Sequence, residues 1–231
     1  MKEIKILSLE TSTTNCSVAL SVNGKTEFLK EENSKNYSHA EQLHVFIDEV
    51  LNQSKLKVHD LDAVAISKGP GSYTGLRIGV SSAKGLCFAS NLPLISIPTL
   101  ESLVHQIATG KLNEGDLIIP MLDARRMEVY TQTYNSNIRA ISNTEAKVLD
   151  ENSFEDLNAT NLHFIGNGVE KFEKITNLKN AYFYAEGIPS ANEMGNIAFR
   201  KFQNKEFEDV AYFEPFYLKD FIAGKPKKRF Q

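Results

Sequence analysis

Short apolar blocks separated by polar turns open the chain and predict β-strands at residues 4–9, 16–22 and 26–29. Asn23-Gly24, between the second and third blocks, is typical of a tight hairpin turn. Apolar residues then recur at helical spacing between residues 38 and 53, with Ser38 as the expected N-cap. This half of the chain therefore predicts a hairpin-rich sheet followed by an amphipathic helix.

The most informative stretch, residues 62–86, joins an apolar run, a glycine-rich loop and a second helical pattern. The run at 63–66 predicts a buried strand, and Ser72 or Thr74 can cap the helix that follows Gly69-Pro70-Gly71. Free N–H groups and the positive end of a helix dipole allow such a loop to hold an anion. The loop matches neither the P-loop nor the dinucleotide-binding motif. A tight turn that lets a helix pack close to a sheet is thus an equally good interpretation.

Small residues form a stripe on the second helix, because Gly75, Gly79 and Ala83 recur every four residues, with Ser82 beside them. Such a stripe allows another chain segment to approach the helix backbone closely. The spacing does not distinguish an internal contact from a contact with a partner chain.

The second half repeats the opening pattern. A strand at 94–97 and a helix at 98–107 are followed by a strand at 117–122 that ends at Asp123, a short turn, and a strand at 128–134. Glu10 lies between the first two strands as Asp123 lies between these two. The repeated hairpin with an acid at the same point predicts two related lobes that face each other across a cleft.

Further strands are predicted at 162–165 and 181–184, a helix from Ser190, and an extended aromatic segment at 207–220. The tail after residue 222 contains the dense basic cluster Lys225-Pro-Lys-Lys-Arg229. It is either a solvated tail or a contact for RNA phosphates. Arg125 and Arg126 leave a similar choice between a phosphate clamp and a salt bridge to the adjacent Asp123.

Composition restricts the class of protein. The chain has 231 residues, 42% hydrophobic and 24% charged, with a net charge of −3. These values fit one bilobal unit or two domains and argue against a broad electrostatic grip on nucleic acid. Cys16 and Cys87 stand alone in apolar segments, as buried thiols do. We expect neither a signal peptide nor a membrane span, and hence a cytoplasmic protein.

Four motifs resemble the TsaB family of tRNA threonylcarbamoyladenosine biosynthesis proteins: Glu10-Thr-Ser12, the stretch 68–79, Leu122-Asp-Ala-Arg125 with Glu128-Val-Tyr130, and Pro215-Phe-Tyr-Leu218. The resemblance implies an α/β actin-like ATPase (ASKHA) fold, with two ribonuclease-H-like lobes of mixed sheets flanked by helices. We expect an N-terminal lobe at 1–103 and a C-terminal lobe at 104–231 whose final segment returns to the first lobe.

The resemblance also implies a role as the non-catalytic partner of the catalytic paralogue TsaD, which acts with the ATPase TsaE. Together these proteins place threonylcarbamoyl on the adenosine next to the anticodon, so tRNA is met through the complex. The paralogue has a His-x-x-x-His metal pair where this chain has Thr99 and Leu103, which are not metal ligands of that kind. We therefore expect no bound metal, no cofactor and no catalytic residue.

The resemblance places the contact with the catalytic subunit on the two N-terminal helices, and it implies a homodimer when the chain is alone. The residues expected in that interface are His39, Leu43, Phe46, Gly75, Gly79, Ser82 and Ala83.

The alternative hypothesis is a stand-alone nucleotide-dependent transferase or kinase of the same superfamily. In that case Glu10 and Asp123 would orient magnesium and the central loop would hold phosphate. The residues expected at this nucleotide or anion site are Glu10, Thr11, Ser12, Gly69, Gly71, Ser72 and Asp123. A peptidase is disfavoured because the chain has neither a Gly-x-Ser-x-Gly nor a His-Glu-x-x-His motif.

Overall fold

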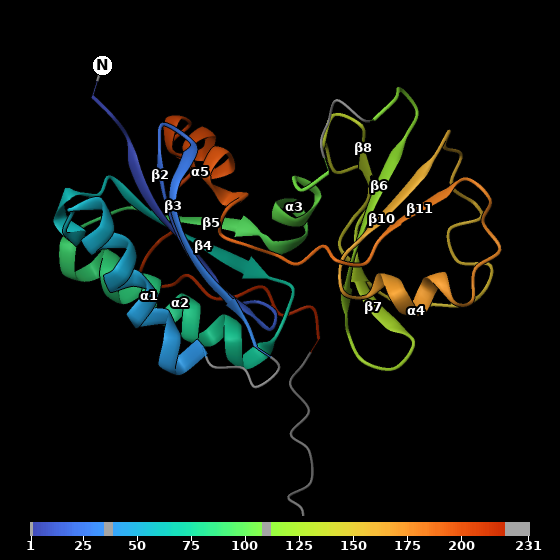
Figure 1. Ribbon diagram of the computed structural model, residues 1–231, viewed down its shortest axis with the longest axis horizontal. Coiled ribbons are helices and arrows are strands. Elements are labelled where there is room, and N and C mark those ends of the chain that lie inside the picture. Colours follow the sequence, from blue (N-terminus) through green and yellow to red (C-terminus); the bar gives the residue numbers. More distant parts are fainter. Residues whose placement is uncertain (1, 35–38, 108–111, 220–231) are drawn as a thin grey trace, which may run out of the picture.

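The computed structural model describes residues 2–34, 39–107 and 112–219, and it contains two lobes, each built on a mixed β-sheet (Figure 1). The predicted cap Ser38 and the basic cluster 225–229 lie outside the described residues. The arrangement is the paired-lobe α/β fold expected from the sequence.

The first sheet has the strand order β3-β2-β1-β4-β5. Its strands are β1 (Lys5–Glu10), β2 (Asn15–Val22), β3 (Lys25–Asn33), β4 (Ala63–Gly69) and β5 (Leu94–Pro98). β1 is antiparallel to β2 and parallel to β4, which is parallel to β5. Asn23 and Gly24 both have positive φ, +51° and +86°, as a tight β2–β3 hairpin requires. The predicted hairpin is confirmed.

The second sheet has the order β11-β10-β6-β7-β9, with the short β8 (Tyr134–Asn135) also paired to β6. Its main strands are β6 (Leu117–Asp123), β7 (Glu128–Thr131), β9 (Glu145–Val148), β10 (Leu162–Ile165) and β11 (Ala181–Tyr184). If β6 is matched to β1, both the order and the strand directions of the first sheet recur. The predicted duplication is therefore present, with β9 as a strand that the pattern did not predict.

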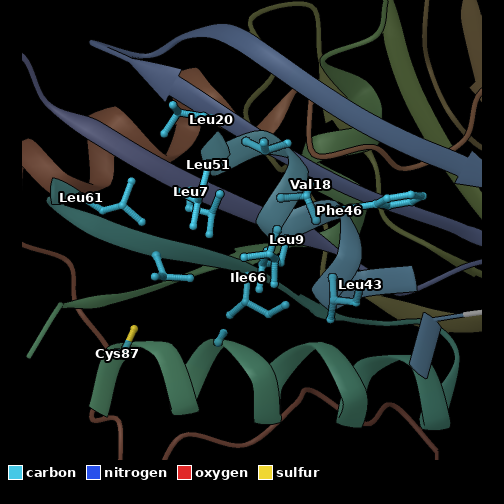
Figure 2. Close-up of a cluster of buried hydrophobic side chains, with 14 of the residues drawn as sticks. Leu7, Leu9, Val18, Leu20, Leu43, Phe46, Leu51, Leu61, Ile66 and Cys87 are labelled. Carbon is cyan, nitrogen blue, oxygen red and sulfur yellow. The ribbon is translucent and has the colours of Figure 1, made fainter. Parts of the chain in front are cut away.

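Two long helices, α1 (His39–Ser54) and α2 (Tyr73–Ser90), cover one face of the first sheet, and the 3₁₀ turn η1 (Val58–Asp60) follows α1 (Figure 1). Figure 2 shows the core between sheet and helices, where Leu7 and Leu9 of β1 meet Leu43 and Phe46 of α1. Ile66 of β4 lies in the same cluster. This core fixes both helices to the sheet, and with them the loops at the ends of the strands.

Two of the remaining three α-helices cross between lobes. α3 (Thr99–Val104) follows the first sheet but contacts β6 of the second as well as β4 and β5. α5 (Met194–Gln203) follows the second sheet but packs against β1, β2 and β5 of the first. α4 (Val169–Glu173) stays in the second lobe, where it contacts β11. The boundary expected at 103/104 thus falls inside α3, and α5 brings the chain back to the first lobe.

The segment 207–219, called the strap below, runs without regular structure from α5 along the first lobe. Glu208 N donates to Leu94 O at 2.8 Å, and Lys84 Nζ on α2 donates to Phe213 O at 2.9 Å. Phe216 N then donates to Lys68 O at 2.7 Å, beside the glycine-rich loop. The strap therefore ties β5, α2 and the end of β4 together.

Candidate functional site

The β1–β2 loop, residues 11–14, is the point on which the expected site residues converge. Thr11 Oγ1 donates to Gly75 O at 2.8 Å. A Cβ atom on Gly75 would lie 2.1 Å from Thr11 O, and one on Gly79 would lie 2.2 Å from Thr11 Oγ1. The small-residue stripe therefore makes room for a loop of the same chain.

The glycine-rich loop closes over the same segment. Ser72 N donates to Ser12 O at 2.6 Å, and a Cβ atom on Gly71 would lie 2.4 Å from that carbonyl oxygen. Ser72 Oγ accepts from Gly75 N at 3.3 Å, which confirms the predicted cap of α2. The backbone of Ser12 thus occupies the position where the sequence suggested an anion. In Gly69, φ is +110° and a Cβ would lie 2.7 Å from Phe216 O of the strap, so glycine is required there too.

Glu10 ends β1 and is completely buried. Its Oε1 accepts from Ser12 N at 2.6 Å, whereas Oε2 has no hydrogen-bond partner among the described residues. Burial raises the pKa of Glu10, although hydrogen bonds from Ser12 and Ser67 offset part of the effect. A completely buried carboxyl group with a raised pKa does not suit a ligand of nucleotide-bound magnesium.

Asp123 ends β6 at the position equivalent to Glu10, but it lies in the other lobe and is exposed. Its carboxylate pairs with Lys171 of α4 at 2.5 Å and accepts from Arg125 N at 3.2 Å. The alternative of a salt bridge from Arg125 or Arg126 to Asp123 is wrong, because Lys171 takes that place. The two acids of the duplicated hairpins have therefore diverged into a buried and an exposed group.

The residues expected to face a partner are largely internal. The buried ones are His39, Leu43, Phe46, Gly75, Gly79 and Ala83. His39 Nε2 lies 2.7 Å from Thr13 O, and burial lowers the pKa of His39. Only Ser82 is half-buried, 3.1 Å from His44 Nε2. The buried residues do not form an exposed interface, because Thr11 fills the space beside Gly75 and Gly79, and Leu43 and Phe46 pack in the core of the first lobe.

The outward face of the same two helices carries a different set of residues. Phe88 of α2 is 85% exposed and Val45 of α1 is 48% exposed. Gly85 lies within α2, and a Cβ atom there would meet nothing within 4 Å. Glycine inside a helix costs about 1 kcal/mol relative to alanine, and no contact within the described chain requires it. The hydrophobic pattern did not predict this face, although Gly85, a glycine inside the helix and outside the stripe, was a visible signal.

Thr99 and Leu103 of α3, where the resemblance implies a metal pair in the catalytic paralogue, are both buried. Thr99 Oγ1 lies 2.6 Å from Ser67 Oγ, and Leu103 packs in the core between α3 and the second sheet. Within residues 2–34, 39–107 and 112–219, no three His, Cys, Asp or Glu side chains are grouped to hold a metal ion. These positions stabilise the junction of the lobes.

A cavity of about 320 Å³ lies where the return segment 186–193 meets β2 and β3. Its polar groups bind one another: Gln106 Nε2 donates to Ile188 O at 2.6 Å, and Ser190 Oγ donates to Glu31 Oε2 at 2.7 Å. Asn15 Nδ2 donates to Pro189 O at 3.1 Å. The side chains of this cavity therefore hold the crossing segment on the first lobe.

Comparison with known proteins agrees with this arrangement. The sequence profile of the family described as tRNA N6-adenosine threonylcarbamoyltransferase matches residues 31–228. The chain is 29% identical to the tRNA threonylcarbamoyladenosine biosynthesis protein TsaB of Haemophilus influenzae, over 97% of this chain and 98% of that protein. Among solved structures, YeaZ from Pseudomonas aeruginosa gives a TM-score of 0.81 at 25% identity, covering 93% of this chain and all of that one.

The fold extends beyond these relatives. An inorganic polyphosphate/ATP-glucomannokinase from Arthrobacter has a TM-score of 0.51 at 9% identity, over 85% of this chain and 98% of that one. None of the helices in the described part of the chain is both long and apolar enough to span a membrane.

Two lobes of repeated topology, with an acid at the end of each of two equivalent strands, give the actin-like ATPase fold. The chain belongs to the tRNA N6-adenosine threonylcarbamoyltransferase family. The relative from Haemophilus influenzae that it matches along nearly its whole length is named TsaB.

Proposed function

We propose that this protein is the non-catalytic subunit of a complex that forms threonylcarbamoyladenosine in tRNA. It binds a TsaD-like catalytic subunit, works with a TsaE-like ATPase in the cytoplasm, and meets tRNA through the complex. The observation that carries the proposal is the full-length similarity to TsaB. It is supported by the burial of Thr99 and Leu103, the positions at which the resemblance implies a metal pair in the catalytic paralogue. A chain of this kind supplies a binding surface to an active partner.

The surface proposed for the catalytic subunit is the outward face of α1 and α2. Phe88 offers a large apolar side chain that is 85% exposed, and Gly85 lets a partner helix approach the α2 backbone closely. Exposed aromatic residues are frequent binding hot spots. In the absence of the catalytic subunit, the same face pairs two copies of this chain as a homodimer. Burial of Phe88 in either pairing removes its apolar surface from water.

The test is co-purification with a TsaD-like subunit, followed by threonylcarbamoyl transfer in a reconstituted mixture. Phe88→Asp should abolish both pairing and transfer, because the variant places a charge in the contact. The matched control is Val148→Asp, since Val148 is 69% exposed on β9 of the other lobe. Both variants should retain wild-type circular dichroism.

If Phe88→Asp pairs normally with the TsaD-like subunit, the proposed surface is refuted. If the wild-type chain does not support threonylcarbamoyl transfer, the proposed function is refuted.

The kinase alternative finds less support in the site. Glu10 is completely buried, and the N–H of Ser72 is engaged by Ser12 O. A phosphate group at the glycine-rich loop would have to displace that backbone contact. Both observations favour the non-catalytic subunit over the kinase.

A further inference from the structure

The cavity where the segment 186–193 meets β2 and β3 carries negative charge that the described chain does not balance. Glu31 of β3 lines it together with Glu186 and Glu193 of the crossing segment, and none of its lining residues is basic. Within residues 2–34, 39–107 and 112–219, none of these three carboxyl groups forms an ion pair. The lining therefore offers three acids without a cation.

Two of these acids are held in place by neutral donors. Ser190 Oγ donates to Glu31 Oε2 at 2.7 Å, and Asn15 Nδ2 donates to the same oxygen at 3.2 Å. Gln106 Nε2 donates to Glu193 Oε2 at 3.3 Å. Hydrogen bonds from hydroxyl and amide groups fix the position of a carboxylate but leave its charge uncompensated.

The carboxyl groups of Glu31 and Glu193 also influence each other. Burial raises the pKa of Glu193, and hydrogen bonds from Asn192 and Gln106 offset part of the effect. The negative charge of Glu31 adds to the rise in the pKa of Glu193. The two groups are therefore close enough to repel each other, and a cation bound in the cavity would replace this repulsion with attraction.

Asn15, the first residue of β2, is a buried residue whose amide oxygen lacks a donor. It is 5% exposed and lines the cavity. Its Nδ2 donates to Glu31 Oε2 and, at 3.1 Å, to Pro189 O, so the orientation of the amide is fixed. Its Oδ1 accepts no hydrogen bond from any described residue. Because polar groups of buried side chains nearly always have a partner, this oxygen indicates a ligand that donates a hydrogen bond.

The remaining lining restricts the chemistry of that ligand. Leu29 and Ile188 add alkyl surface, and the volume of about 320 Å³ lies at the lower end of the range for small-molecule sites, about 300–1,000 Å³. A nucleotide, phosphate or carboxylate would meet no basic residue. In the part of the chain that the structure describes, no three His, Cys, Asp or Glu side chains are grouped to hold a metal ion. An organic cation with an aliphatic chain suits the lining.

We propose that this cavity binds a small aliphatic amine with two or more ammonium groups, of the kind represented by spermidine. The ammonium groups donate to Glu31, Glu193 and Asn15 Oδ1, in charge-assisted hydrogen bonds where the acceptor is a carboxylate. The methylene groups pack on Leu29 and Ile188. Since the acids come from both β3 and the crossing segment, the bound amine joins that segment to the first sheet. This binding function is separate from the proposed function, and its test needs no catalytic subunit.

The experiment titrates spermidine into the full chain by calorimetry at one fixed, low ionic strength, because salt screens exposed charges. The variant is Glu31→Gln/Glu193→Gln. Glutamine keeps an acceptor oxygen for Ser190 and Gln106, so the hydrogen bonds that hold the crossing segment are retained. The variant should bind spermidine more weakly by about tenfold or more, since it loses two charge-assisted contacts. Binding within about twofold of wild type would overturn the proposal.

The matched control is Glu151→Gln/Glu155→Gln, which changes the net charge by the same amount in the second lobe. Both residues are exposed, and neither carboxylate has an ion-pair partner within the described ranges. The control should bind spermidine within about twofold of wild type, because long-range charge contributes little when salt screens it. An equal loss in the control and the cavity variant would overturn the proposal, since net charge alone would then explain binding.

A ligand series on the wild-type chain tests the chemistry without relying on any variant. Hexanediamine should bind, whereas hexanediol, which has the same chain without charge, should not. Equal binding of the two, or binding of magnesium chloride as tight as that of spermidine at the same ionic strength, would overturn the proposal. Saturating spermidine should also raise the melting temperature of the wild-type chain and leave that of Glu31→Gln/Glu193→Gln unchanged. An equal rise in both proteins would place the amine elsewhere and refute the site.

Discussion

Two glycines of α2, six residues apart, should respond to the same substitution with opposite signs. In Gly85→Ala the added methyl group meets nothing within 4 Å. The variant should gain the helix propensity of alanine, about 1 kcal/mol. For a protein of this size, that gain corresponds to a rise of about 2–4 °C in melting temperature.

In Gly79→Ala the same propensity gain is outweighed. The new Cβ would lie 2.2 Å from Thr11 Oγ1 and 2.9 Å from Ile66 Cδ1. Thr11 would have to give up its hydrogen bond to Gly75 O, which leaves a buried hydroxyl unsatisfied at about 1–3 kcal/mol. Overpacking of the core adds about 1–3 kcal/mol. We expect a net destabilisation of at least about 1 kcal/mol, and hence a difference of about 2 kcal/mol or more between the two variants.

Urea unfolding at one fixed protein concentration measures both variants, because any self-association makes stability depend on concentration. The midpoints should move in opposite directions at unchanged m-values. Equal stabilisation of both variants would refute the reasoning that the stripe is an internal packing face. Destabilisation by Gly85→Ala would show that the outward face is occupied, either within the chain or by a second copy of it.

Three further outcomes are expected. Ala83→Arg should lose several kcal/mol of stability and unfold at lower urea than wild type, because it places an unpaired charge at a fully buried position; an unchanged urea midpoint would contradict this. Glu10→Gln should gain stability relative to wild type as pH rises above 4.5. The raised pKa of Glu10 makes the wild-type free energy of unfolding fall between pH 4.5 and the higher pKa of the folded state. Parallel pH profiles of the urea midpoints of the two proteins would contradict a raised pKa. Calorimetry with ATP and magnesium should detect no binding with a dissociation constant of about 1 μM, because the backbone of Ser12 fills the glycine-rich loop. Binding with that dissociation constant, abolished by Asp123→Ala, would revive the kinase alternative.

The parts of the fold that local chemistry specifies could be predicted from the sequence. Asn23-Gly24 determines a hairpin through its positive φ values, and Ser72 determines where α2 begins. The duplicated hairpin was visible because Glu10 and Asp123 end equivalent strands. By contrast, β9 was missed, because Glu145-Ala-Lys-Val148 at the sheet edge is only four residues long and contains a single residue of high β-propensity, Val148.

The candidate site was only partly predictable, because its meaning depends on contacts that are distant in sequence. Spacing showed that Gly75 and Gly79 share one face of α2. Thr11 fills that face, but it is 64 residues from Gly75 in sequence, so only the packing of the folded chain brings it there. The environment of Glu10 likewise includes Ser67 of β4, which is distant in sequence and which no local pattern reports. Gly85 was visible in the sequence, but only the structure shows that the space beside it is open, unlike the space beside Gly75 and Gly79.

The exchange of α3 and α5 between lobes also determines when the protein can fold during synthesis. Ile6 of β1 and Ile97 of β5 lie on the sheet face that is closed by Ile197 and Ala198 of α5. Until α5 has been translated, the first sheet exposes this apolar face to water and to neighbouring nascent chains. Contacts that join residues so far apart in sequence form slowly, and exposed apolar surface in such intermediates promotes aggregation. A chain released before α5 should therefore depend on chaperones, even though its first five strands are complete.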